Sequence, residues 1–446
     1  MAILSQNYSL DKCVIVTSLG QPIDFTNLFQ EFNYYEDIFG AFVSGDITIN
    51  DSLGLLSQMG FNGHEYLMLE FSQPNLAECQ SLSRSFRIYK VSNRQLTRDQ
   101  NETYTLHFCS EETILSEQYR ISKSYKSKLV SDMVTDIMAN YLKKPVILNI
   151  EPTKGLRDII IPNMKPLEAL NWLTTQAISA SNAGADYLFY ENYNGYNFST
   201  LQSLYNNEVP ARLKFKYQPK NIQQVDENNP AENMINVYSF EVINNFDSLF
   251  GNNSGMLANR LISVDIIRQK YTNTVFDYAK YFSSAKKLNP NPVLSNFQNR
   301  FGDTDNATAN ATLKVVTTNT GQTTYSPYIK SRQPDIRDIN IEKIVPHRTA
   351  QIPLSTYIRY KIAVPGNPQL TVGQVIEFYL PEISRRPGGK DEDRFYSGKY
   401  LVTAVRHKID FENRFVTVME ISKESLPSAY DSIDNSSPAW KNQVAQ

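Results

Sequence analysis

Similar alternating segments occur near the two ends of this chain of 446 residues. In residues 85–111, and again in residues 399–423, one alternating segment leads through a polar turn to a second. The segments before the two copies, residues 66–71 and 375–379, also agree. The corresponding apolar positions are Phe86, Ile88 and Val91 in the first copy and Tyr400, Val402 and Val405 in the second. Alternation is typical of half-buried β-strands, so the repeat predicts two related antiparallel β domains.

The first of these domains is expected in residues 1–120. Five segments there are alternating or rich in β-branched and aromatic residues, as strands are, and turn residues separate them. They are residues 14–16, 45–50, 65–71, 85–91 and 103–109. A short helix is expected at residues 52–59. Five or six short strands without a long helix favour an antiparallel barrel or a sandwich.

Residues 121–232 are expected to form an inserted α+β domain. Apolar residues at helical spacing form a broad stripe, which predicts one helix; they are Leu129, Val130, Met133, Val134, Ile137, Met138, Tyr141 and Leu142. Pro166 predicts the first turn of a second helix, with Asn163 as its cap. Residues 187–200 predict a β-hairpin that turns at Asn194-Gly195. One face of this hairpin is aromatic, and we interpret that face as the core of the domain itself.

The second β domain is expected to be discontinuous, in residues 233–280 and 336–425. Residues 281–335 between these parts are rich in Asn, Thr and Ser and show no periodicity, which predicts a polar inserted loop. Residues 426–446 have little apolar content and predict an extended C-terminal tail. The whole chain is therefore expected to be mainly β with an α+β insertion.

Residues that could carry chemistry are scattered along the chain. No His has a Cys, Asp or Glu at metal-ligand spacing, and no nucleotide-binding glycine motif occurs, so we expect no metal and no cofactor. His107 and Cys109 lack a third orienting group. The carboxylates of residues 391–393 and 111–112 could form a glycosidase pair, but solvated charge runs are commoner. We therefore expect no catalytic residue and no enzymatic activity.

The overall charge and hydropathy argue against two further classes of protein, strongly basic nucleic-acid-binding proteins and membrane-spanning proteins. The formal net charge is −2, so no global basic field draws the chain to nucleic acid. No apolar run reaches the ~20 residues that a membrane-spanning helix needs. The first residues lack the basic and apolar regions of a signal peptide. We expect no membrane insertion.

Several stretches resemble the central baseplate hub proteins of contractile-tailed phages. In the α+β domain these are Pro-Leu-Glu-Ala at 166–169, Phe-Tyr-Glu-Asn at 189–192, Gly-Tyr-Asn-Phe at 195–198, Ser199 and Ser203-Leu204. Residues 255–278 and 364–381 resemble hub segments that follow in the second β domain. The resemblance covers about a third of the residues and is spread over most of the chain.

The resemblance implies a structural virion protein of the phage tail baseplate, assembled in the host cytoplasm. It implies two β-barrels per chain and a homotrimeric ring with approximate sixfold symmetry. Such a ring adapts the hexameric tail tube to the trimeric central spike, lies among the baseplate wedge proteins, and lets DNA pass through its lumen without specific binding. The same fold forms the base of type VI secretion spikes, so a spike base is one alternative. A carbohydrate-binding tail adhesin or depolymerase component is another.

Five residues are candidates for contacts with other proteins. Trp172 lies on the polar side of its expected helix, so it needs a partner, which we expect to be the aromatic hairpin of the same domain rather than another subunit. Arg385 and Arg386 lie in a polar loop between two expected strands. Tyr430 and Trp440 are aromatic residues of the expected C-terminal tail.

Overall fold

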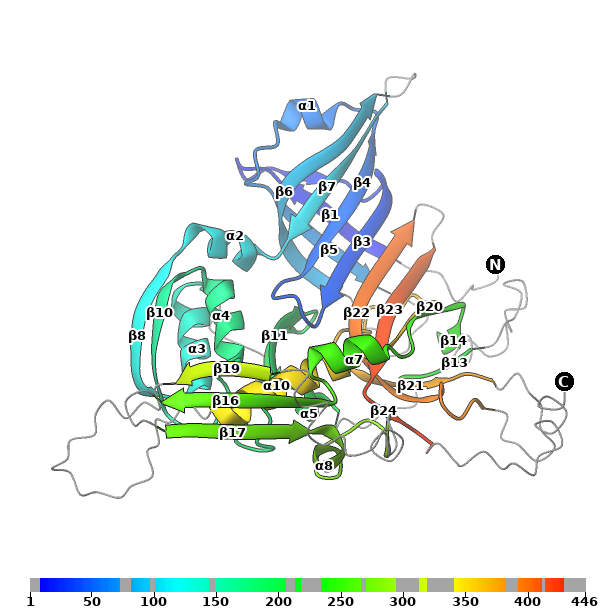
Figure 1. Cartoon of the computed structure of the whole chain (residues 1–446). Coiled ribbons are helices and arrows are strands. Elements are labelled where there is room, and N and C mark those ends of the chain that lie inside the picture. Colours follow the sequence, from blue (N-terminus) through cyan, green and yellow to red (C-terminus); the bar gives the residue numbers. More distant parts are fainter. Residues whose placement is uncertain are drawn as a thin grey trace, which may run out of the picture.

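A computed structural model of the chain (Figure 1) describes most of it. The described residues are 9–72, 82–96, 101–143, 149–205, 213–217, 234–265, 270–293, 313–318, 341–381, 392–410 and 414–428. These residues are mainly β, as the alternating segments predicted, with short helices between the strands. Two β domains lie one above the other in Figure 1, and an α+β unit lies beside their junction.

The first β domain contains seven strands. They are β1 (Ser9–Val16), β2 (Pro22–Asp24), β3 (Phe29–Asp37), β4 (Ser44–Asp51), β5 (Tyr66–Ser72), β6 (Leu82–Leu96) and β7 (Glu102–Cys109). Their order in the sheet is β3-β4-β7-β6-β5-β1-β2, and neighbours are antiparallel. The helix expected before β5 is present as α1 (Leu55–Met59). Alternate side chains point inward and form a buried apolar core that includes Phe32, Tyr34, Phe86 and Phe108.

The second β domain also contains seven strands. They are β13 (Lys214–Tyr217), β14 (Asn236–Val237), β15 (Ser239–Asn244), β20 (Ile358–Pro365), β21 (Val375–Tyr379), β22 (Gly398–Asp410) and β23 (Phe415–Lys423). Their order is β15-β20-β23-β22-β21-β13-β14. The seven strands thus correspond to those of the first domain in chain order and in spatial order. Two strand pairs differ in direction, because β13 is parallel to both β21 and β14, whereas β1 is antiparallel to both β5 and β2.

A β-bulge occupies the same place in both domains. Between β6 and β7 the register shifts after Ile88, and between β22 and β23 it shifts after Val402. These two residues correspond in the sequence repeat, so Tyr89 and Thr403 are the extra residues of equivalent bulges. Bulges depend on local backbone geometry that changes little within related domains. The strand order and the bulge are therefore repeated together.

The expected closed barrels are not formed by strand ladders among the described residues, because neither strand order returns to its first strand. The free edge of β3 pairs with β22 of the other domain instead of with a strand of its own domain. All fourteen strands consequently belong to one sheet. In Figure 1, β22 lies directly beside β3 at the junction of the two domains.

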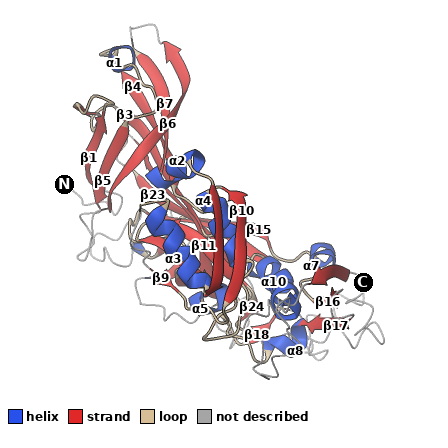
Figure 2. Ribbon diagram, turned by 90° about the vertical axis from the view of Figure 1, so that its left-hand side faces the viewer, coloured by secondary structure: helices blue, strands red, loops and turns tan. Residues whose placement is uncertain are grey.

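The middle of the chain forms the expected α+β unit. Its elements are α2 (Glu111–Gln118), β8 (Ile121–Lys128), α3 (Val130–Asn140), β9 (Asn149–Ile150), β10 (Arg157–Met164), α4 (Pro166–Thr174), β11 (Tyr187–Asn192), β12 (Gly195–Thr200) and α5 (Leu201–Leu204). Both predicted helices are present, as α3 and α4. Figure 1 shows α3 and α4 between the β8–β10 pair and β11, and Figure 2 shows the same unit from the side of β10. The α3 stripe packs with Tyr187, Phe189, Tyr196 and Phe198, so the aromatic hairpin face belongs to the core of this unit.

Two local details of this unit differ from the prediction. The hairpin turns at Tyr193 and Asn194, because Asn192 pairs with Gly195 and its Oδ1 accepts the N–H of Asn194 at 3.0 Å. The strand register is therefore shifted by two residues, which leaves the same side chains on each face. Asn163 does not cap α4; it lies in β10 with φ 52°, at an irregularity in the β8–β10 register.

The region after residue 244 also differs from the prediction. Residues 258–277, expected in the second barrel, form β16 (Ala258–Asp265) and β17 (Lys270–Asp277) of a separate sheet, and β19 (Leu313–Thr318) joins it from within the expected loop 281–335. The other elements here are α7 (Ser248–Ser254), α8 (Tyr278–Phe282), β18 (Asn291–Pro292) and α10 (Ile341–Ser355). The expected tail begins with β24 (Ser425–Leu426), which pairs with β18. Backbone pairing needs no apolar periodicity, which explains why β18, β19 and β24 were not predicted.

Candidate assembly interface

The junction between the two β domains is the most extensive contact between segments far apart in the sequence. Residues Ala404 to Asp410 of β22 pair in antiparallel register with Asp37 to Glu31 of β3. The pairing continues where the N–H of Ile38 donates to the carbonyl oxygen of Thr403 at 2.9 Å. One strand thus holds both domains in a fixed register.

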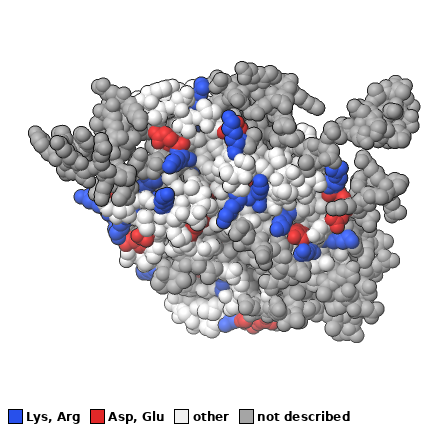
Figure 3. All heavy atoms as spheres, turned by 90° about the horizontal axis from the view of Figure 1, so that it is seen from below, with Lys and Arg blue, Asp and Glu red and all other residues white. Residues whose placement is uncertain are grey.

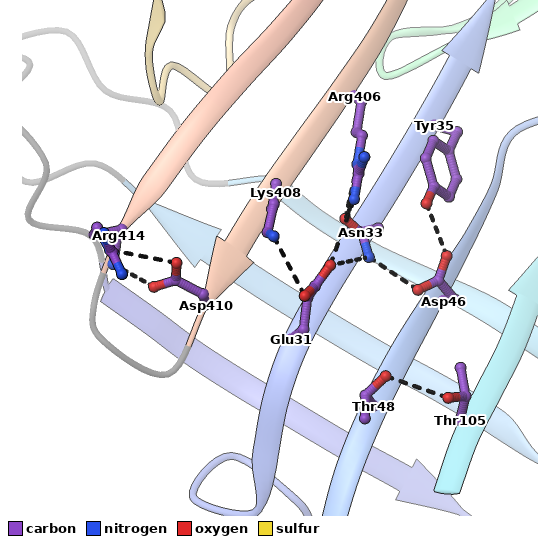
Figure 4. Close-up of polar contacts among 10 residues, drawn as sticks. All are labelled: Glu31, Asn33, Tyr35, Asp46, Thr48, Thr105, Arg406, Lys408, Asp410 and Arg414. Carbon is purple, nitrogen blue, oxygen red and sulfur yellow. Dashed lines mark hydrogen bonds and ion pairs between the residues drawn. The ribbon is translucent and has the colours of Figure 1, made fainter. Parts of the chain in front are cut away.

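Polar side chains on the outer face of this junction form a network (Figure 4). Arg406 Nη2 donates to Asn33 Oδ1 at 2.7 Å, and Asn33 Nδ2 donates to Asp46 Oδ1 at 2.9 Å. Lys408 Nζ lies 3.3 Å from a Glu31 carboxylate oxygen. Burial raises the pKa of Glu31, but the hydrogen bond from Asn33 and the charge of Lys408 outweigh it and lower that pKa. Half-exposed ion pairs each contribute about 1 kcal/mol or less, so this network favours the register more than it stabilises the fold.

A buried carboxylate on the inner face joins the domains more directly. Glu36 of β3 accepts hydrogen bonds from Tyr34 Oη at 2.9 Å, from Thr371 Oγ1 at 2.6 Å and from the N–H of Val372 at 3.0 Å. Burial raises the pKa of Glu36, and these three donors, together with the N–H of Tyr193, oppose that rise. Because two donors lie between β20 and β21, the loop of the second domain is fixed to the first.

His407 is buried at the same junction. Its Nε2 lies 3.1 Å from the carbonyl oxygen of Leu370 and its Nδ1 lies 3.0 Å from Thr417 Oγ1. A carbonyl oxygen can only accept, so Nε2 carries the proton of the neutral ring. Burial lowers the pKa of His407 to about 4, since the imidazolium form cannot be solvated there.

The pH dependence of stability is expected to change when His407 is replaced by Gln. The unfolded chain protonates His407 near pH 6.5 and the folded chain only near pH 4, so this residue costs stability as the pH falls between these values. Urea unfolding of the two proteins at pH 7 and pH 4.5 should show a smaller loss in the variant, by roughly 2–3 kcal/mol. His64→Gln, at an exposed position, is the control. Equal losses in all three proteins would contradict the assignment.

Glu191 anchors the α+β unit to the first β domain. This side chain of β11 is fully buried; it accepts hydrogen bonds from Arg84 of β6 and from Ser110 Oγ. The N–H of Val43 donates to its Oε2 at 2.9 Å. Arg84 also donates to the carbonyl oxygen of Asn192 at 3.0 Å. Burial opposes the charge on Arg84, but the Glu191 carboxylate outweighs it and raises the pKa of Arg84.

The structure places only one of the five predicted contact residues. Trp172 is half-buried and packs against the core that contains the hairpin aromatics. Arg385, Arg386, Tyr430 and Trp440 lie outside the described residues. The junction residues were missed by sequence reasoning. A lone Glu191 in an aromatic strand was one available signal, and the polar alternation of Arg406 and Lys408 in the repeat was another.

Replacement of Trp172 by Ala is expected to lower the free energy of unfolding of the monomer by about 2–3 kcal/mol, because a half-buried aromatic ring leaves the core. Trp172→Phe should recover most of this loss. Urea unfolding at a concentration where the chain is monomeric measures both. Unchanged stability together with lost assembly would instead make Trp172 an interface residue.

Three of the five carboxylates that we considered for catalysis have structural hydrogen-bond partners. Tyr66 Oη donates to Glu111 Oε1 at 2.8 Å and Tyr196 Oη donates to Glu112 Oε2 at 3.3 Å. Asp393 Oδ1 accepts the N–H groups of Phe395 and Tyr396, both at 2.8 Å. Asp391 lies outside the described residues. Within the described ranges, no three His, Cys, Asp or Glu side chains form a group that could hold a metal ion.

The thiol of Cys109 is also a poor nucleophile in this fold. Burial raises its pKa to about 11, so it is protonated at neutral pH. His107 Nε2 lies 2.6 Å from Ser92 Oγ, which gives this imidazole a hydrogen-bond partner of its own. The pair that we considered from the sequence therefore lacks an activated thiolate.

Comparison with known proteins agrees with a structural tail component. No protein-family model matches the chain. A probable baseplate hub protein of Vibrio phage KVP40 is 20% identical over 425 residues, which cover 94% of this chain and 95% of that protein. The chain is a homologue of a phage baseplate hub protein. The resemblance that the sequence motifs indicated is thereby confirmed, and it extends over nearly the whole chain.

Two solved structures share the fold. The tail protein from Neisseria meningitidis MC58 has a TM-score of 0.52 at 10% identity and covers 95% of this chain and 100% of its own. The 43 kDa tail protein of prophage MuSo2 from Shewanella oneidensis has a TM-score of 0.52 at 9% identity and covers 93% and 98%. Within the described residues, no helix is long and apolar enough to cross a membrane.

Proposed function

We propose that three copies of this chain form the ring-shaped hub of a phage baseplate. The observation that carries this proposal is the repeated strand order with its equivalent bulge. A chain with two similar domains presents two similar surfaces, so a trimer presents six and can match a sixfold partner on one side and a threefold partner on the other. The homologous baseplate hub protein supports this placement.

Each β domain would be a barrel in this ring. In the first domain, the other five strands have the order β4-β7-β6-β5-β1. The consecutive strands β2 and β3 pair with the two ends of this order, β2 with β1 and β3 with β4. In the second domain, β14 and β15 are placed in the same way between β13 and β20. We infer that each consecutive pair acts as one bent strand that closes its sheet, and that the barrels line the ring.

The partners in this proposal are the tail tube, the central spike and the surrounding wedge proteins, with DNA passing through the lumen without specific binding. The charge distribution supports weak contact with DNA. In the view from below (Figure 3), the Lys and Arg side chains of the described residues lie among acidic and uncharged surface and form no single basic tract on that face. With a net charge of −2, little counterion release would favour DNA binding.

The test is the mass and symmetry of the purified chain. Light scattering should give the mass of three chains, and electron micrographs should show a threefold ring with six lobes that binds the cognate tail tube protein end-on. Polysaccharide and peptidoglycan hydrolysis should stay at background. A chain that remains monomeric, alone and with the tube protein, would overturn the hub proposal, and hydrolysis lost in Glu392→Gln would favour the depolymerase alternative.

A further inference from the structure

The two strands that form the β22–β3 junction each have an equivalent strand in the other domain, β6 for β22 and β15 for β3. One edge of β22 is used twice, because β21 pairs with residues 398–401 and β3 pairs with residues 404–410. The equivalent edge of β6 is used once. On this edge β5 pairs with residues 82–87. Residues 90–96, which follow the bulge, pair with β7 on the opposite edge, but no described strand pairs with them on the β5 edge. The position that β3 occupies on β22 is thus open on β6.

The strand equivalent to β3 is open as well. β3 pairs with β4 on one edge and with β22 on the other. Its counterpart β15 pairs with β20 on one edge, and no described strand pairs with its other edge. β6 and β15 belong to different domains and lie apart in Figure 2. Among the described residues, the strand edge of β6 that corresponds to the β3-binding edge of β22 is therefore unpaired, and so is the edge of β15 that corresponds to the β22-binding edge of β3.

Side-chain exposure differs accordingly between equivalent positions. The ladders place Leu96 opposite Glu102 and Ile409 opposite Phe415. These two pairs correspond because β6 has a second register shift, between Ser92 and Gln95, which β22 lacks. Ile409 is 0% exposed, whereas Leu96 is 80% exposed. Tyr34 is 0% exposed, whereas its counterpart Val242 is 46% exposed. The residues that the junction covers in one place are uncovered in the other.

The surface around β15 is also unusually apolar. The strand, the loop after it and α7 carry five large hydrophobic side chains with substantial exposure, namely Val242, Ile243, Phe246, Leu249 and Phe250. Clusters of exposed apolar residues are typical of interaction sites. An open strand edge beside such a cluster needs a partner that supplies both backbone groups and apolar contacts.

We propose that residues 90–96 of β6 in one copy of the chain pair antiparallel with β15 of a second copy. This contact repeats the β22–β3 junction between subunits, so a ring of three chains has six similar junctions, three within chains and three between them. In this register Gln95 lies opposite Glu241, as Lys408 lies opposite Asn33 within the chain. The inference rests on the proposed trimer and specifies which strands join its subunits.

Disulfide trapping tests the register. In a Cys79→Ser background, Gln95→Cys and Glu241→Cys are combined; both native side chains are exposed, and paired strand residues bring Cβ atoms close enough for a disulfide. Oxidation should convert most of the protein to a reducible species of three chains on a denaturing gel. Each single variant, and Gln95→Cys combined with Ser239→Cys two residues out of register, should form little of it.

A second variant tests the same surface without cross-linking. Val242→Glu places a charge on the exposed edge, so it should raise the concentration at which half of the chains are trimeric by about tenfold or more. Val315→Glu, at an exposed apolar position of β19, is the matched control and should leave that concentration unchanged.

The outcomes separate the junction from the hub proposal. A native trimer that forms no in-register disulfide, or whose assembly is unaffected by Val242→Glu, overturns the β6–β15 junction and leaves the hub proposal standing. Oxidation to an open ladder of oligomers overturns ring closure through these strands. A wild-type chain that stays monomeric at every concentration overturns the hub proposal and this junction together.

Discussion

Replacement of Glu191 by alanine is expected to lower the free energy of unfolding by about 3–5 kcal/mol. The substitution leaves the Arg84 guanidinium, which is 19% exposed, without its carboxylate, and it removes the acceptor for Ser110 and for the N–H of Val43. A buried charge without a partner costs far more than the pair contributed. Because Glu191 joins the α+β unit to the first β domain, hydrogen exchange of β11 should also become faster.

Two variants serve as controls for this effect. Glu191→Gln keeps an acceptor of the same size but not the charge, so its loss should be smaller than that of Glu191→Ala. Glu117→Ala removes a carboxylate from the exposed pair with Lys165, and such pairs contribute about 1 kcal/mol or less. Urea unfolding followed by circular dichroism compares the three proteins. If Glu191→Ala cost no more than Glu117→Ala, Glu191 would not be the anchor of the unit.

Phe415→Ala is expected to have a comparable effect, a loss of about 3–5 kcal/mol. Phe415 lies at the start of β23 in the second domain, yet it is fully buried in the core of the first. Its ring meets those of Phe71 and His407, each with ring centroids 5.7 Å apart. Removing it leaves a cavity where the domains meet, so unfolding should lose cooperativity between them.

A substitution at Gly366 tests whether the Phe415 ring packs where the structure places it. A Cβ atom at Gly366 would lie 2.0 Å from the Cγ atom of Phe415, so Gly366→Ala must displace the ring and should cost about 1–3 kcal/mol. In the Phe415→Ala background the same substitution should cost little, because the methyl group then enters the cavity. The double-mutant cycle measures this coupling. Additive losses from the two substitutions would show that the ring does not pack against Gly366.

Local sequence periodicity determined where many of the strands and helices of this protein form. Alternation predicted β4 to β7 and the β20–β23 region, the apolar stripe predicted α3, and Pro166 predicted the start of α4. These features depend on residues within one element, because a strand or helix places side chains on its faces at a fixed period. The repeat of Phe86, Ile88 and Val91 likewise predicted two related domains, and these domains share a bulge at the equivalent place.

The tertiary structure alone decided how these elements join. The ladder between β22 and β3 connects residues more than 360 positions apart in the sequence. It is formed by backbone N–H and C=O groups, which every residue except proline has, so no side-chain pattern predicts it. The same reason explains the unpredicted β16–β19 pairing. The helix α10 was not predicted, because Pro346 and Pro353 inside it are unfavourable for a helix. Burial of Ile344, His347 and Leu354 in the folded chain stabilises it. Sequence period fixes which face of an element is buried, but only packing selects the partner that buries it.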